Sequence, residues 1–242
     1  MHRSRSPLTG RLFALLAAGA LLCLATAAAA ASPTLERIRQ GGTMTFAYRD
    51  GASPFSFRDR DARVRGYSVE VCARVAAAIQ KELKLPELKV EWLPVDAATR
   101  LDAVASGKAD AECGTTTVTL TRMERVDFSL PIFVDGGGVL VKAKSKVSRL
   151  KDLKGRRIAV IGGTTTEQAL TRVLSAAEAP AILVPVKDGA EGMALLAQGK
   201  VDGYAGDRVV LAGLRVRANA PEALVFVPGD LSFEPYALVL PR

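Results

Sequence analysis

The sequence predicts an α/β fold made of two lobes with the same local plan. From residue 43 onward, short apolar segments typical of strands alternate with longer amphipathic segments typical of helices. Such alternation indicates mainly parallel sheets covered by helices. A short pattern also occurs twice: Ala-Ser-Gly-Lys-Ala-Asp at 105–110 resembles Ala-Gln-Gly-Lys-Val-Asp at 197–202, 92 positions later. Two similar lobes would produce this repeat; the alternative is a chance similarity between two common helix-to-strand loops.

The first half of the chain is expected to contain three strands and two helices. The helix at 67–83 has an apolar face, because Cys72, Val75, Ala76 and Ile79 recur at helical spacing. The other elements follow the alternation of apolar and amphipathic segments: strands at 43–49, 88–95 and 109–114, and a helix at 97–107.

A second alternation follows three consecutive glycines and an apolar extended segment at 139–142. We expect strands at 157–161, 182–186 and 201–205, and helices at 165–177, 190–198 and 208–217. Two further strands, at 224–227 and 236–240, complete the expected fold.

The first 31 residues have the features of a cleavable secretory signal. Arg3, Arg5 and Arg11, without any acidic residue, precede an Ala- and Leu-rich run that ends on small residues before Ser32. An uncleaved membrane anchor is the alternative, because about 20 apolar residues can span a bilayer. The small residues at the end of the run favour cleavage, and we therefore expect an exported protein.

Charge and composition exclude several classes of function. Residues 1–31 contain three arginines and no acid, so the remainder has 30 Lys and Arg against 25 Asp and Glu, a net charge of +5 instead of +8. These charges are scattered, without a basic stripe interleaved with aromatics, which disfavours nucleic acid as a partner. The only histidine, His2, lies in the signal, so the mature protein has no histidine base or zinc ligand. We expect neither a metal nor a cofactor.

Cys72 and Cys113 are the two cysteines outside the signal. Export to an oxidising compartment permits a disulfide between them. The preferred interpretation is two buried thiols that behave as small apolar side chains, with the disulfide as the alternative.

Polar residues follow the terminal glycine of each repeat, Thr115 in the first copy and Asp207 in the second. Ligands of open α/β sheets bind beyond the carboxyl ends of strands, so two facing lobes would place both residues in one cleft. The first copy continues as Thr115-Thr116-Thr117, with Arg122 beyond. Hydroxyls and a guanidinium suit a planar anion such as a carboxylate. The alternative is that the threonines only favour a strand and that Arg122 is a solvated charge.

A second candidate anion site is the stretch Gly162-Gly163-Thr164-Thr165-Thr166-Glu167. Thr164 and Glu167 form a capping-box pattern at a helix start, where free N–H groups attract anions. The pattern would also occur in a helix without any ligand. No Lys-Ser/Thr follows, so a nucleotide is unsupported. Arg49 ends the first strand, and Arg100 lies in the first turn of a helix. The alternative for each is a surface charge. A cation in the first turn of a helix is slightly unfavourable, which favours a functional role for Arg100.

These motifs together resemble the periplasmic amino-acid-binding proteins of ABC importers, solute-binding protein family 3, and most closely the glutamate/aspartate-binding branch. The resemblance runs from about Leu35 to the last residue. The segments that carry it are Pro54-Phe55-Ser56-Phe57, Gly66-Tyr67-Ser68, Glu112 to Thr117 with Arg122, Asp127-Phe128-Ser129, Gly163-Thr164-Thr165, and Asp207.

The resemblance implies a type II periplasmic-binding-protein fold, in which two hinge strands join two α/β lobes. It places lobe 1 at 32–140, lobe 2 at 141–232, and a hinge strand that returns to lobe 1 at 233–242. Family members usually continue for further helices beyond this strand. We therefore expect a shortened carboxyl end and an exposed apolar surface on lobe 1.

The resemblance also implies roles for the candidate residues. Arg122, helped by Thr117 and Thr165, would bind the α-carboxylate of an amino acid, and Thr115 and Asp207 its α-ammonium. Arg49, assisted by Arg100, would meet a side-chain carboxylate. The ligand-binding residues are thus expected to be Arg49, Arg100, Thr115, Thr117, Arg122, Thr164, Thr165 and Asp207.

Charge favours an acidic ligand, because three arginines and one aspartate give this site a charge of +2. A neutral ligand would leave a buried arginine unpaired. Ala97 and Gly189 stand where the acidic-amino-acid branch often has Ser and can have His, which leaves the choice between glutamate and aspartate open. We expect a monomeric, non-enzymatic periplasmic protein that delivers its ligand to a membrane permease.

An enzyme of the same fold, a cyclohexadienyl (arogenate or prephenate) dehydratase, is the alternative. Such an enzyme needs a carboxylic acid in the cleft as a proton donor. Glu112 and Glu167 are the nearest candidates, and the capping box already accounts for Glu167.

Overall fold

The computed structural model describes residues 32–242. The expected signal at 1–31 lies outside the described residues. No helix in the described part is long and apolar enough to cross a membrane. The chain divides into two compact units at Gly41 and Gly42. In the first unit the structure describes the helix α2 (Pro33–Gly41), where Arg39 pairs with Glu36 at 3.3 Å.

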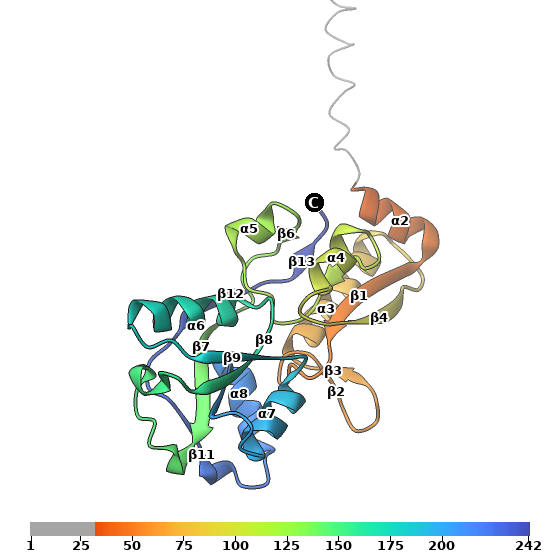
Figure 1. The fold of residues 1–242 in the computed structure, drawn as a ribbon. Helices are drawn as coiled ribbons and strands as arrows, with labels where there is room; N and C mark the ends of the chain where they lie inside the picture. The colour runs from red at the N-terminus through yellow and green to blue at the C-terminus, as the bar shows by residue number, and fades with distance from the viewer. Residues whose placement is uncertain (1–31) are drawn as a thin grey trace, which may run out of the picture. The chain divides into compact units, whose positions relative to one another are not determined.

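The second unit contains two main sheets, and the first has the strand order β4-β1-β5-β13-β6 (Figure 1). Three strands at one side of this sheet are parallel: β4 (Lys89–Val95), β1 (Thr43–Arg49) and β5 (Ala111–Glu112). The helices α3 (Tyr67–Glu82) and α4 (Arg100–Ala105) both contact β1.

The remaining strands of the first sheet come from later in the chain. The strand β13 (Val239–Leu240) lies antiparallel between β5 and β6 (Asp127–Phe128). A short helix, α5 (Leu120–Met123), precedes β6. A two-stranded ribbon of β2 (Phe57–Arg58) and β3 (Val64–Arg65) stands apart from both sheets.

The second sheet combines a parallel and an antiparallel part. The strands β10 (Gly203–Asp207), β8 (Arg157–Ile161) and β9 (Ile182–Val186) run parallel, in that order. The long strand β7 (Phe133–Lys142) is antiparallel to β10, and it also pairs with β11 (Leu224–Phe226) and β12 (Ser232–Tyr236).

Helices cover both faces of this second sheet. Residues that alternate along β7 belong to different cores: Val139 and Val141 to one, Leu140 to the other. Leu170 and Leu174 of α6 (Thr165–Ala176) pack in the first core. The second core includes side chains from α7 (Gly189–Ala197) and α8 (Arg208–Val216). The predicted α/β class, with helices on both faces, is confirmed here.

Two antiparallel segments connect the sheets. The strands β7 and β12 pair side by side, with Phe133 opposite Tyr236 and Gly137 opposite Ser232. From Tyr236 the chain passes through two residues into β13 of the first sheet. Tyr236 packs there against Phe55, whose ring centroid lies 5.4 Å away, so Phe55 belongs to the core. The lobe boundaries proposed from the sequence remain a prediction.

Several expected elements differ from the observed ones. The expected helix at 97–107 begins at Arg100, because the Asp96 carboxylate accepts hydrogen bonds from the backbone N–H groups of Ala98 and Thr99 and closes a turn first. The single strand expected at 236–240 is two strands, β12 and β13, since the intervening residues cross between the sheets. The sequence interpretation also missed α2, α5, β2, β3 and β6.

A disulfide joins Cys72 of α3 to Cys113, which follows β5, with their Cα atoms 6.3 Å apart. The preference for two free thiols was therefore wrong, and the alternative holds. Sequence periodicity placed Cys72 correctly on the buried face of α3, but it could not supply the distance between the two residues.

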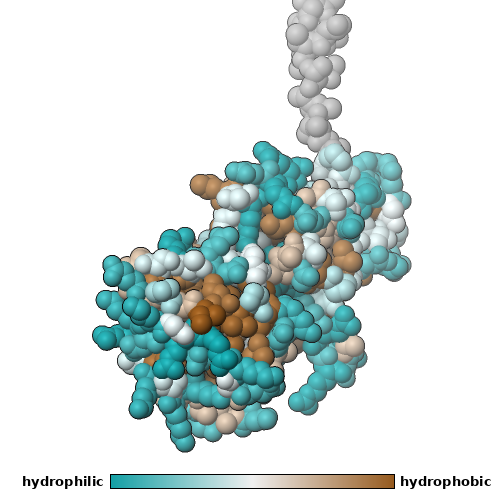
Figure 2. All heavy atoms as spheres, in the orientation of Figure 1, coloured by the Kyte–Doolittle hydropathy of each residue, from teal (hydrophilic) through white to brown (hydrophobic). Residues whose placement is uncertain are grey.

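Figure 2 shows apolar residues gathered over the region of β8 and β9. Ile182 at the start of β9 is 57% exposed. Elsewhere Leu120 of α5 is 85% exposed and Leu130, after β6, is 87% exposed. These two leucines belong to the segment that supplies β6 to the first sheet.

Candidate functional site

A cavity of about 750 Å³ lies at the carboxyl ends of the parallel strands of both sheets. In the first sheet β1 ends at Arg49 and β4 at Val95, and Thr115 follows β5. In the second sheet β8, β9 and β10 end at the cavity in the same way. Parallel strands place their carboxyl ends at one edge, where open α/β sheets bind ligands. The residues at these strand ends that line the cavity are Arg49, Val95, Thr115, Ile161, Val186 and Asp207.

Arg49 and Thr115 form the polar part of the wall on the side of the first sheet. The Arg49 Nη1 donates a hydrogen bond to the Thr115 Oγ1 at 3.1 Å. The backbone N–H of Arg49 donates to the Ser56 Oγ at 3.0 Å, which fixes the end of β1. Two of the predicted site residues therefore meet at the cavity, and both line it.

The start of α6 supplies polar groups from the second sheet. The Thr164 Oγ1 accepts from the backbone N–H of Glu167 at 3.2 Å, and the Glu167 carboxylate accepts from the N–H of Gly163 at 2.8 Å. The predicted capping box is therefore present. Thr164 also lines the cavity, whereas Glu167 does not.

Asp207 is held by a residue that sequence reasoning did not assign. The Thr166 Oγ1 donates to the Asp207 Oδ1 at 3.0 Å, and both residues line the cavity. The run of three threonines at the helix start was the available signal, but only the fold shows which one faces Asp207.

Thr117, Thr165 and Arg122 come together around an unexpected carboxylate. The hydroxyls of Thr117 and Thr165 both donate to the Glu234 Oε2, at 2.5 and 2.7 Å. The Ser232 Oγ donates to the other oxygen of Glu234, whose side chain is only 1% exposed. The Thr117 and Thr165 hydroxyls are therefore already bonded to protein. The nearby Arg122 Nη1 donates to the Thr117 carbonyl oxygen at 2.7 Å.

Arg100 and Glu112 are buried behind the cavity wall and do not line it. Within the described residues, no hydrogen-bond partner reaches the Arg100 Nε and Nη1 or the Glu112 Oε1. Burial, with the positive charge of Arg49, lowers the pKa of Arg100 to about 9. Burial raises the pKa of Glu112, against the opposing effect of Arg100. The Thr116 hydroxyl donates to the other oxygen of Glu112 at 2.7 Å.

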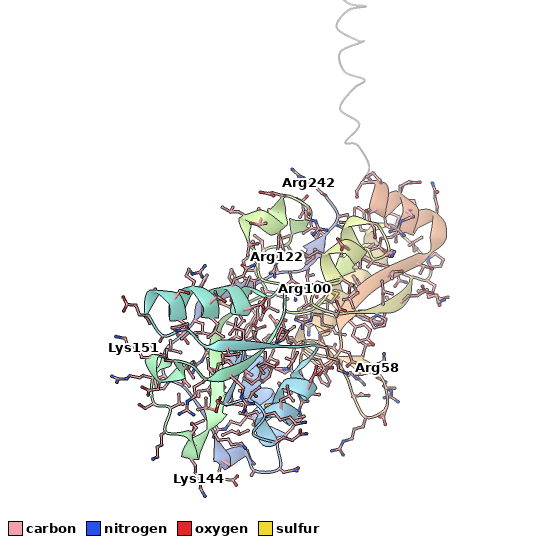
Figure 3. The ribbon with its side chains drawn as sticks, in the orientation of Figure 1. Arg58, Arg100, Arg122, Lys144, Lys151 and Arg242 are labelled. Atoms are coloured by element: carbon pink, nitrogen blue, oxygen red, sulfur yellow. A yellow bond between two sulfur atoms is a disulfide. The ribbon has the colours of Figure 1, made fainter. Side chains whose placement is uncertain are left out.

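The three arginines form one electrostatic group. Figure 3 shows Arg100 and Arg122 in the region where the two sheets approach each other, whereas Arg58 lies away from them on the β2–β3 ribbon. Arg49 and Arg122 each lower the pKa of Arg100, after burial. Burial also lowers the pKa of Arg122, while the charge of Glu234 opposes this. Such a group would be stabilised by an added anion.

The cavity wall also contains two residues with small or no side chains, and a tyrosine to which the sequence gave no role. Ala97 and Gly189, which the resemblance marked as departures, both line the cavity. Tyr204 in β10 lines it too. Sequence reasoning placed Tyr204 in a strand but gave it no role. Its position in the wall depends on how β10 packs against α7.

A family model agrees with this arrangement over most of the chain. Residues 44–227 match the bacterial extracellular solute-binding proteins, family 3. An L-glutamate/L-aspartate-binding protein of Pseudomonas aeruginosa is 33% identical over 222 residues, which cover 91% of this chain and 74% of the relative. A glutamate/aspartate import solute-binding protein of Salmonella typhimurium is 32% identical over 213 residues, 88% of this chain and 70% of the relative.

Solved structures agree as well. A periplasmic binding protein from Brucella ovis with glutathione bound has a TM-score of 0.78 and 27% identity. The match covers 86% of this chain and 65% of that one, so the chain spans less than two thirds of that protein. An ancestral amino acid-binding protein, a precursor of cyclohexadienyl dehydratase, has a TM-score of 0.71 and 29% identity over 86% of each chain.

The family match covers well over half of the chain, the curated relatives exceed 30% identity, and the cavity lies where two similar α/β sheets present their strand ends. The chain belongs to the bacterial extracellular solute-binding proteins of family 3.

Proposed function

We propose that this protein binds an acidic amino acid, glutamate or aspartate, in the 750 Å³ cavity and delivers it to an ABC importer from the periplasm. The observation that carries the proposal is the arginine group: Arg49 faces the cavity, and Arg100 is buried behind it with two N–H-bearing nitrogens unbonded within the described residues. The names of the two curated relatives support the same ligands.

The α-carboxylate of the ligand would lie at the start of α6, where Thr164 and Thr166 line the cavity. Glu234 occupies the hydroxyls of Thr117 and Thr165, and neither these threonines nor Arg122 line the cavity. The donors left for the ligand are therefore the first backbone N–H groups of the helix, and Arg122 would act through its charge. The α-ammonium would lie between Asp207 and Thr115, which are an anion and a hydroxyl acceptor in the wall.

The side-chain carboxylate of the ligand would pair with Arg49, and Arg100 would act from behind the wall. The structure lowers the charge expected from sequence, because Glu112 and Glu234 add two buried carboxyls to the +2 of the arginines and Asp207. Burial raises the pKa of Glu112, which favours its neutral form and weakens its opposition to the positive charge of the arginines.

The non-enzymatic role is favoured over a dehydratase. The two carboxyls named from sequence as proton donors, Glu112 and Glu167, do not line the cavity. The curated relatives reported above are named as binding proteins. The monomeric state and the processing of residues 1–31 remain predictions.

A thermal-shift screen of the exported protein against all common amino acids tests the proposal. Glutamate and aspartate should raise the melting temperature, because a ligand that binds only the folded state stabilises it. A shift with arginine, lysine or a neutral amino acid, and none with the two acidic ones, would refute the proposed ligand class.

A further inference from the structure

Tyr204 presents a hydroxyl without a protein partner to the cavity. The residue is the second of β10, lines the cavity, and is only 2% exposed. Across the described part of the chain, no residue forms a hydrogen bond with this hydroxyl. Buried tyrosine hydroxyls usually have a partner, so this one has an unused donor at the ligand site.

The Tyr204 ring packs against two glycines of α7, where a larger residue would leave no room for it. A Cβ atom on Gly192 would lie 2.7 Å from the ring carbon Cε2 and 2.8 Å from Cζ. A Cβ atom on Gly189 would lie 3.5 Å from the Tyr204 hydroxyl oxygen. The ring therefore fills space that side chains at the start of α7 would occupy, and the hydroxyl lies beside the first residue of that helix.

The charged side chains near the Tyr204 hydroxyl form hydrogen bonds with other protein groups and not with this hydroxyl. Arg49 bonds Thr115, and Asp207 accepts from Thr166. Asp188 caps α7 by accepting from the backbone N–H of Glu191 at 2.8 Å. Burial, and then the charge of Asp207, raise the pKa of Tyr204, so the phenol keeps its proton and can donate it in a hydrogen bond.

Tyr204, Arg49 and the amino end of α7 together offer donors. The partial positive charge of the helix start offsets part of the negative charge of its cap, Asp188, which also lines the cavity. Because Gly189 has no side chain, it leaves the hydroxyl and the helix start open to the cavity. A carboxylate placed here can accept hydrogen bonds from Tyr204 and Arg49, which both line the cavity.

We propose that Tyr204 is a specificity-determining residue that donates a hydrogen bond to the side-chain carboxylate of the bound amino acid, next to Arg49. The proposal rests on the proposed binding of glutamate or aspartate. The side-chain carboxylate of the ligand would therefore lie against the part of the wall formed by β10 and α7.

The test is the Tyr204→Phe variant, which keeps the ring on Gly192 and removes only the hydroxyl. Calorimetric titration should show a dissociation constant for glutamate raised about tenfold or more, because a hydrogen bond to a charged group is lost. The melting temperature without ligand should stay near that of the wild type. Tyr67→Phe is the matched control, since its hydroxyl donates to the Ile132 carbonyl at 2.8 Å outside the cavity, and its glutamate affinity should not change.

Carbon-13 NMR of labelled glutamate identifies the contact. Between the wild-type and Tyr204→Phe complexes, the resonance of the side-chain carboxylate should move while that of the α-carboxylate stays. An unchanged glutamate affinity, or a shift confined to the α-carboxylate, overturns the proposal for Tyr204. Failure of the wild type itself to bind glutamate and aspartate refutes the proposed function, and with it this proposal.

Discussion

Arg49 and Arg100 differ in how each can act on a ligand. Arg49 lines the cavity and bonds Thr115, whereas Arg100 is 3% exposed and lies behind the wall. The resemblance gave Arg49 the contact with a side-chain carboxylate and Arg100 an assisting role, but it did not show that Arg100 lies behind the wall. Arg49 can bind a carboxylate directly, and Arg100 contributes mainly through its charge.

The Arg49→Ala variant should lose affinity for acidic amino acids. Removal of a guanidinium that pairs with a carboxylate should raise the dissociation constant for glutamate at least about tenfold. Arg58→Ala is the matched control, because Arg58 bonds the Tyr48 hydroxyl at 2.6 Å and does not line the cavity. Titration calorimetry measures both variants, and equal losses in the two would contradict the role of Arg49.

Glu112 should make stability depend on pH. Burial raises the pKa of Glu112 above its ordinary value of 4.5 in the folded state, so folding favours the protonated form. The wild type should therefore lose stability as the pH rises through this raised pKa. Glu112→Gln cannot ionise and should lose less stability over the same interval. Melting temperatures between about pH 5 and pH 8 measure this difference. Parallel curves for the two proteins would show that Glu112 does not titrate in that range.

At the scale of elements, local pattern predicted the parallel parts of the fold best. The strands at 43–49, 157–161 and 182–186 occur as expected. Each is a short apolar run between helices, so neighbouring residues suffice to identify it. Antiparallel pairing by β12 and β13 depends on residues about 100 positions away, which local pattern cannot show.

Because local sequence pattern does not show long-range contacts, only some of the site residues could be predicted from the sequence. Asp207 ends β10 and Thr115 lies just beyond β5, so their position at the cavity could be predicted. Glu234 contacts Thr117 and Thr165 only because β12 pairs with β7, and Tyr204 faces the cavity only because two glycines of α7 admit its ring. Both depend on tertiary packing.

The Cys72–Cys113 disulfide should stabilise the contact between α3 and β5. It closes a loop with a sequence separation of 41 residues, for which chain entropy predicts about 4 kcal/mol of stabilisation. The double variant Cys72→Ala, Cys113→Ala should lose a free energy of unfolding of this order in urea titrations. A loss below about 1 kcal/mol would mean that native contacts or residual unfolded structure offset the loop closure.

The strand β12 should depend on the buried side chain of Glu234. Its carboxylate accepts from Thr117, Thr165 and Ser232, and a glutamine offers only one oxygen to these donors. Glu234→Gln should lose about 1–3 kcal/mol of unfolding free energy in urea titrations. Ser232→Ala, which removes one donor and leaves the carboxylate, should lose less. A larger loss for Ser232→Ala than for Glu234→Gln would contradict this role of the carboxylate.

In the whole molecule, the cavity lies between two sheets that are connected by a pair of strands. Six parallel strands direct their carboxyl ends to the cavity, and β7 and β12 run side by side where the chain passes between the sheets. Two sheets joined by a pair of strands can change their relative angle through few backbone rotations. We therefore expect the ligand to be enclosed by a hinge motion, driven by contacts that only the closed form makes.

The central claim is that the arginine group around this cavity binds an acidic amino acid. Titration calorimetry of the exported wild-type protein with glutamate, and separately with arginine, tests it most directly. We expect saturable heat with glutamate and none with arginine, because Arg49, Arg100 and Arg122 repel the positively charged side chain of an arginine ligand. Saturable binding of arginine without binding of glutamate or aspartate would contradict it.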